Sequence, residues 1–202
     1  MEAFQMNENL TLQIFAFDCN AIPNEQHDNI IKAVKKYGTA LKKTGRKQHV
    51  SGIRFTRNEE YIIKNCPLEK FKVNSWLEND GSGANNMLDQ TSRIIYKAGE
   101  RLASEPEEER PSQVIVTIIC FGRDNASVHC TYETLRNMIA TQRDVYKWKF
   151  FLMTDFTINM EKLGIAEEDT ILIKKREADW FKRPYEELTE KMVACLTQKE
   201  NE

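Results

Sequence analysis

The chain has 202 residues, of which 41% are hydrophobic and 30% charged, a composition typical of a folded globular protein. This length suits one domain, so we expect residues 1–202 to form a single unit. Lys and Arg number 29 against 31 Asp and Glu, which argues against nucleic-acid binding, because such binding needs a basic surface to neutralise phosphates.

The apolar segments are too short to cross a membrane. The longest, residues 114–121, is interrupted by Thr117, whereas a spanning helix needs about 20 apolar residues. The first dozen residues lack a basic region followed by an apolar stretch, so no signal peptide is predicted and we expect a cytosolic protein. Five cysteines without a C-x-x-C pair predict free thiols rather than disulfides or a zinc site.

The first part of the chain alternates strand-like and helical patterns. Residues 10–17 have bulky apolar side chains on both faces, as in a strand covered on both sides. Residues 29–43 repeat apolar side chains at three- and four-residue steps, which predicts an amphipathic helix. Two shorter strands, 49–56 and 61–64, flank a polar segment and predict a hairpin.

The middle of the chain contains a glycine turn, Gly81-Ser82-Gly83, and then helical spacing from about Asn85 to Leu102. A charged connector, residues 105–110, leads to residues 114–121, whose apolar side chains on both faces are typical of a central parallel strand. Beyond the polar loop after that strand, Thr131 can cap a third helix. The remaining predicted elements are a strand at 148–153, a helical turn at 158–163, a strand at 170–173 and a closing helix from about 185 to 196.

Strands separated by helices of this length imply right-handed crossovers and a mostly parallel sheet with helices on both faces. In such sheets the ligand crevice lies beyond the carboxyl ends of the strands, where the strand order reverses. The loops after Phe17, Phe121 and Met153 are therefore the first places to look for a site.

The strongest resemblance to a known family lies in residues 101–165. There Arg-Leu-Ala-Ser-Glu-Pro-Glu-Glu-Glu-Arg-Pro leads to Val-Ile-Val-Thr-Ile-Ile-Cys-Phe-Gly-Arg-Asp-Asn-Ala-Ser and then to Tyr-Lys-Trp-Lys-Phe-Phe-Leu. These residues resemble the von Willebrand factor A (vWA) domain family, in particular its stand-alone bacterial and phage members, and the resemblance extends more weakly over nearly the whole chain. It implies an α/β, three-layer Rossmann-like vWA fold with a central mostly parallel sheet, an antiparallel edge strand and helices on both faces.

The family's motif is a metal-ion-dependent adhesion site (MIDAS): Asp-x-Ser-x-Ser after the first strand, a Thr in a Gly-rich loop and an Asp ending the central strand. Here Asp18 keeps the first ligand, whereas Asn20 and Ile22 replace the two serines. Asn85 replaces the Thr and Phe121 replaces the Asp. Mg²⁺ gives up hydration only for well-placed oxygens, so this degenerate site predicts neither a bound metal nor another cofactor.

Several of these residues also have purely structural interpretations. Asp18 can cap nearby N–H groups, and Asn85 is a good helix N-cap. Arg123 and Asp124 can form an exposed ion pair that contributes little to stability, although their position beside the degenerate site also suits contact with a docking partner.

The resemblance implies a non-enzymatic protein-protein interaction module that binds another protein, without a cation, through the loops at the carboxyl ends of the strands. The expected contacts are Asp18, Asn20, Asn85, Phe121, Arg123 and Asp124. The alternative is a rebuilt divalent-cation site, made from Asp18, Asn20, Asn85 and Asp124, that binds a partner's carboxylate.

One segment matches an enzyme pattern, the His-Cys-x5-Arg spacing of a cysteine-dependent phosphatase loop. Cys130 would be the nucleophile and Arg136 would clamp the phosphate. However, no glycine lies between them to let N–H groups converge, and Glu133 would bring a negative charge into the anion site. Because common nucleotide-binding, hydrolase and metalloprotease motifs are also missing from the sequence, we expect no enzymatic activity.

Overall fold

The computed structural model describes residues 7–19, 26–55, 61–71, 83–174, 180 and 182–197. Within these ranges one six-stranded sheet has the order β3-β2-β1-β4-β5-β6. The strands are β1 (Asn7–Phe17), β2 (Lys47–Arg54), β3 (Tyr61–Pro67), β4 (Pro111–Cys120), β5 (Lys149–Thr154) and β6 (Thr170–Leu172). Only β3 pairs in the antiparallel sense, which confirms the predicted hairpin and the mostly parallel sheet with an antiparallel edge.

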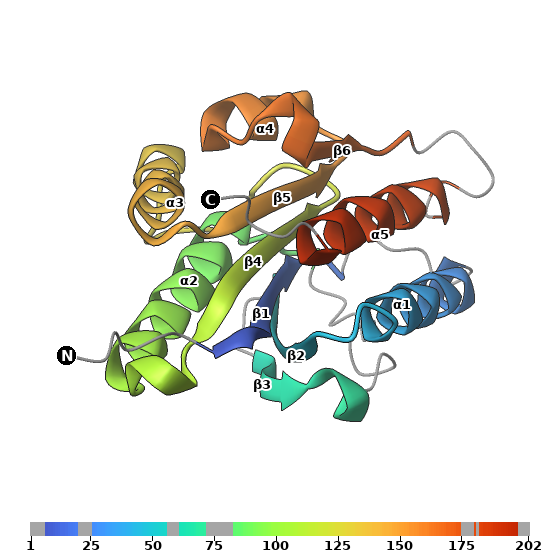
Figure 1. Ribbon diagram of the computed structural model, residues 1–202. Coiled ribbons are helices and arrows are strands. Elements are labelled where there is room, and N and C mark those ends of the chain that lie inside the picture. The colour runs from blue at the N-terminus through green and yellow to red at the C-terminus, as the bar shows by residue number, and fades with distance from the viewer. Residues whose placement is uncertain are drawn as a thin grey trace.

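Helices cover both faces of the sheet, as Figure 1 shows, and this confirms the expected three-layer α/β fold. The helices are α1 (His27–Lys42), α2 (Met87–Ser104), α3 (Tyr132–Tyr146), α4 (Thr157–Leu163) and α5 (Lys182–Thr197). α1 and α5 bury one hydrophobic cluster against the sheet, and α2, α3 and α4 bury a second cluster on the other face. No helix in the described part of the chain combines the length and the apolar character needed to cross a bilayer.

The central strand β4 explains why two cores form. Ile115 and Ile119 belong to the cluster under α1 and α5, whereas Val116 and Ile118 belong to the cluster under α2, α3 and α4. Successive side chains of a strand point to opposite faces, so a run with apolar residues at both odd and even positions contributes to both cores.

A chain of buried polar side chains joins α1 to the sheet. The Tyr37 hydroxyl donates to Gln13 Oε1 over 2.7 Å. The Gln13 amide donates to the side chain of Gln48, whose own amide donates to the Leu41 carbonyl over 3.0 Å. Burial raises the pKa of Tyr37 well above its ordinary value. The side chains of Tyr37, Gln13 and Gln48 therefore satisfy one another, which reduces the desolvation cost of burying them.

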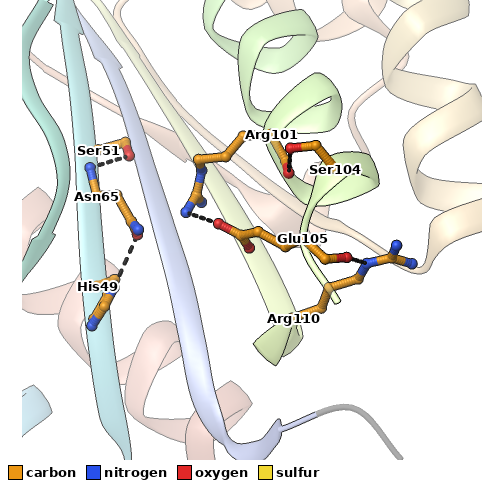
Figure 2. A network of polar contacts seen from close by, with 7 residues as sticks. All are labelled: His49, Ser51, Asn65, Arg101, Ser104, Glu105 and Arg110. Carbon is orange, nitrogen blue, oxygen red and sulfur yellow. Dashed lines mark hydrogen bonds and ion pairs between the residues drawn. The ribbon is translucent and has the colours of Figure 1, made fainter. Parts of the chain in front are cut away.

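A second polar network lies near the amino ends of the parallel strands (Figure 2). Asn65 has a φ of 45° at an irregularity in the β2–β3 ladder, and its N–H donates to the Ser51 hydroxyl over 3.0 Å. Its Oδ1 lies 2.9 Å from Nδ1 of His49. Across the network Arg101 pairs with Glu105 at 2.9 Å. The contacts of Asn65 join β2 to β3, and the Arg101–Glu105 pair closes the carboxyl end of α2, both at the end of the sheet opposite the predicted site.

Candidate functional site

The strand order reverses between β1 and β4, because β1 continues to β2 on one side and β4 to β5 on the other. Their carboxyl ends meet at this point, where α/β sheets bind ligands. Asp18 follows β1, and its N–H donates to the carbonyl of Ile119 in β4 over 2.9 Å. Asp18 thus lies at the predicted edge, whereas Asn20 and Ile22 fall outside the described residues, as do Gly81 and Ser82 of the glycine turn.

Asp18 and Asn85 are in direct contact at this edge, and both are buried, with 2% and 6% of their surfaces exposed. The Asn85 Nδ2 donates to Asp18 Oδ2 over 2.9 Å, while Asn85 Oδ1 accepts the N–H of Met87 over 3.1 Å. A backbone N–H can only donate, so it fixes the amide oxygen on α2 and directs the NH₂ group toward Asp18. The N-cap of α2 is Asn86, so Asn85 is not the cap that the sequence suggested. Asn85 lies one residue before the cap, bonds the first N–H of the helix and is the neutral partner of the carboxylate.

Cys120 contributes the third group of this cluster. Its Sγ lies 3.5 Å from Asn85 Nδ2, and its thiol donates to the Gly122 carbonyl over 3.1 Å. Burial raises the pKa of this thiol to about 12, so it remains protonated at neutral pH. A buried neutral thiol acts as a small apolar group with weak hydrogen-bonding ability.

Phe121 points away from the cluster, into the core beneath α1 and α5. Only 3% of its surface is exposed, and its ring meets that of Trp180 edge to face, with centroids 5.7 Å apart. Because neighbouring residues at the end of a strand alternate between faces, Cys120 lies beside Asp18 and Asn85 while Phe121 packs on the opposite side. The residue that occupies the position of the motif's last Asp thus fills the core.

Asn159 extends the cluster and carries no sequence motif that would have identified it. It lies on α4 and is fully buried. Its Nδ2 lies 3.3 Å from the Thr154 hydroxyl and 3.4 Å from the Gly122 carbonyl, and its Oδ1 accepts a hydrogen bond from the Tyr132 hydroxyl over 2.8 Å. These bonds connect the ends of β4 and β5 with α3 and α4.

The loop from β4 to α3 is fastened to the start of α2 by the carboxylate of Asp124. Asp124 Oδ2 accepts the N–H of Leu88 over 2.8 Å and the hydroxyl of Ser127 over 2.7 Å. Its Oδ1 accepts the N–H groups of Ala126 and Ser127 over 3.3 and 3.0 Å. The negative charge lies at the amino end of α2, where it also interacts favourably with the helix dipole.

Asp89 makes the reciprocal connection from α2 to the same loop. Its carboxylate accepts three consecutive N–H groups, those of Val128, His129 and Cys130, over 2.9, 3.0 and 2.7 Å. The carboxylates of Asp124 and Asp89 therefore fix this loop at both of its ends. Most of the hydrogen bonds involved are donated by backbone N–H groups to these two side chains.

Arg123 is exposed on this loop, and its guanidinium lies over the Phe156 ring, 5.5 Å from the ring centroid. The ion pair expected between Arg123 and Asp124 is not among the contacts of the described residues. Asp124 is engaged by the loop and α2, whereas the Arg123 side chain is exposed to solvent.

The phosphatase-like segment does not form an anion site. The N–H groups before and at Cys130 already hold the Asp89 carboxylate, and burial raises the pKa of the Cys130 thiol. Thr131 Oγ1 accepts the N–H of Thr134 over 3.1 Å and α3 begins at the next residue, which confirms the predicted cap. Arg136 lies alongside Gly164. A phosphate would have to displace an internal carboxylate to reach these amides.

Neither a family model nor a curated protein matches the sequence. Solved structures do match. Proximal thread matrix protein 1 from the mussel byssus has a TM-score of 0.63 at 11% identity, with 95% of this chain and 47% of that chain covered. Another structure of that protein, with a zinc-occupied MIDAS motif, has a TM-score of 0.62 at 13% identity, with 95% and 48% covered. The open conformation of the pilus adhesin SpaC from Lactobacillus rhamnosus GG has a TM-score of 0.62 at 10% identity, with 95% and 31% covered.

This chain therefore spans about half or less of the length of these proteins, and identities this low support a likeness of fold alone. The α/β fold is vWA-like, as the resemblance in the sequence implied.

Proposed function

We propose that this chain is a non-enzymatic protein-interaction module that binds its partner through the loops at the carboxyl ends of the strands, without a cation. The observation that carries the proposal is the contact between the Asn85 amide and the Asp18 carboxylate. In a metal site a cation neutralises such a carboxylate. Here a neutral amide N–H donates to the carboxylate instead, and the amide oxygen that could have served as a ligand is bonded to Met87.

The surrounding groups support the same conclusion. Mg²⁺ requires several oxygen ligands in near-octahedral geometry. Cys120 presents a protonated thiol to the cluster, and Phe121 packs into the core. Each carboxylate oxygen of Asp124 already accepts two hydrogen bonds, so the alternative rebuilt cation site would have to break the connection between the loop and α2.

The exposed part of the β4–α3 loop is suited to protein contact. Val128 is an apolar residue with 80% of its surface exposed, and Arg123 and His129 are exposed on the same loop. Because Asp89 and Asp124 hold the backbone, binding would cost little ordering of the loop. The named solved relatives include a matrix protein and an adhesin, which agrees with a role in protein interaction.

The cation-free state is tested by calorimetric titration of EDTA-stripped protein with Mg²⁺ and with Mn²⁺, together with thermal unfolding at millimolar metal. We expect neither binding heat nor a shift in Tm, and Asp18→Ala should behave in the same way. Saturable binding that disappears in Asp18→Ala would show that the site has been rebuilt, and the proposal would be wrong.

Partner binding is tested with a photo-crosslinking amino acid in place of Val128, applied in native cell extract. We expect adducts that form equally well in EDTA and in Mg²⁺ and that decrease when Arg123→Glu is added. Lys42→Glu, on the exposed side of α1, is the control for nonspecific charge effects and should leave the adducts unchanged. Adducts that are lost in EDTA would contradict cation-free binding.

A further inference from the structure

A groove runs between the amino-terminal halves of α1 and α5, which lie next to each other on one face of the sheet (Figure 1). Its volume is about 220 Å³. Small-molecule sites usually occupy about 300–1,000 Å³, so the groove suits one or two side chains of a peptide better than a whole cofactor. The lining residues are Gln26, Asn29, Lys32, Ala33, Lys36, Lys182, Tyr185, Glu186 and Thr189.

The charges along this groove are mostly positive. Three lysines, Lys32, Lys36 and Lys182, line it, together with a single acidic residue, Glu186. Lys36 pairs with Glu186 over 2.8 Å, and Lys36 is the main cause of the lowered pKa of that carboxyl. Among the described residues, Lys32 and Lys182 have no ion-pair partner. Since the whole chain has a net charge of −2, this positive potential is a local feature.

Two further features refine the chemistry of the occupant. The groove follows the first turns of both helices, so their dipoles add to the positive potential of the lysines. Ala33 and the ring of Tyr185 provide an apolar surface between the lysines. A ligand that matches both features has carboxylates flanking an apolar side chain.

We propose that the α1–α5 groove binds an acidic segment of a partner protein, with an apolar side chain against Ala33 and Tyr185 and carboxylates at Lys32 and Lys182. The inference rests on the proposed function as a protein-interaction module and assigns it a second contact surface, separate from the β4–α3 loop. Such charge complementarity directs association and gives the binding a strong dependence on salt.

The test uses a fluorescein-labelled peptide of repeating Glu-Glu-Leu units, with a Gln-Gln-Leu peptide of equal length as the neutral comparison. Binding is followed by fluorescence anisotropy at low and at high salt, with the double variant Lys32→Glu/Lys182→Glu. The matched control is Lys42→Glu/Lys43→Glu, which makes the same change in net charge at exposed residues of the other end of α1. Both groove lysines are exposed and Lys182 begins α5, where a Glu suits the helix dipole, so the groove variant should remain folded.

We expect the acidic peptide to bind the parent saturably and more weakly at high salt, and the groove variant to bind it about tenfold less tightly than the control variant does. Equal effects of the two double variants, or no saturable binding at millimolar peptide, would overturn the inference. So would a single-stranded oligonucleotide that binds the groove more tightly than the peptide, or dimerisation of the parent that the groove variant abolishes. If Arg123→Glu removes peptide binding and the groove variant does not, the groove inference fails while the proposed function stands.

Discussion

Replacing Asp89 by Ala tests whether a single carboxylate fixes the β4–α3 loop against α2. The variant removes the acceptor for the N–H groups of Val128, His129 and Cys130. Hydrogen bonds to a charged group contribute about 1.5–3 kcal/mol each, but Val128 and His129 are exposed, so water can replace the carboxylate at their N–H groups. Mainly the partly buried Cys130 N–H remains without an acceptor.

We therefore expect a loss of about 3 kcal/mol in the free energy of unfolding, well below the sum of three charged bonds. For a chain of this length, that loss lowers Tm by about 6–12 °C. Urea unfolding followed by circular dichroism measures the change, and Asp89→Asn, which keeps one acceptor oxygen, should lose less. Asp144→Ala removes an exposed carboxylate paired with Arg143 and should change stability by less than about 0.5 kcal/mol. If Asp89→Ala is as stable as this control, the loop is held by other contacts and the reasoning is refuted.

Three further predictions concern the buried groups. Burial raises the pKa of Cys120 to about 12, so its thiolate is scarce at pH 8. A thiol reagent should therefore label Cys120 only after unfolding. Rapid labelling of Cys120 in the folded protein, located by mass spectrometry, would contradict its burial. Gln13→Leu removes the acceptor of the Tyr37 hydroxyl and should lower the free energy of unfolding by about 2 kcal/mol, measured by urea unfolding. An unchanged urea midpoint would mean that the chain of Tyr37, Gln13 and Gln48 contributes little to stability. Phe121→Asp gives position 121 the aspartate of the MIDAS motif but places a carboxylate against Trp180. We therefore expect the free energy of unfolding to fall by more than about 3 kcal/mol, and Mg²⁺ should not reverse this loss.

The order of strands and helices could be predicted because the parallel strands are apolar on both faces, whereas the apolar residues of the helices recur every three or four positions. The boundaries were less accurate. β4 begins at Pro111, three residues before the apolar run at Val114, since Gln113 still pairs with Thr11 of β1. Backbone pairing does not depend on the polarity of the side chain, so an apolar pattern marks the buried part of a strand rather than its end.

The proximity of Asp18 and Asn85 was predictable from the sequence, but the orientation of the Asn85 amide was not. The resemblance placed Asp18 and Asn85 at one edge of the sheet, and the structure brings them into contact. Which end of the Asn85 amide faces the carboxylate depends on the N–H of Met87, a backbone group that no side-chain motif represents. Asn159 approaches from α4, far along the chain, so only tertiary packing brings it to the ends of β4 and β5.

In the proposed cation-free module, the amide beside Asp18 changes where a partner can bind. A bound divalent ion at the centre of the site would offer an open coordination position to a partner's carboxylate. The Asn85 NH₂ group has two hydrogens, and it makes two contacts, with Asp18 and with Cys120. The Asn85 amide at the centre of the site therefore has no N–H left for a partner. The groups that a partner can contact lie on the rim of the site, where Arg123 and Val128 are exposed on a loop fixed by internal carboxylates. Selection on such a surface would preserve the rigidity of the loop rather than a set of metal ligands.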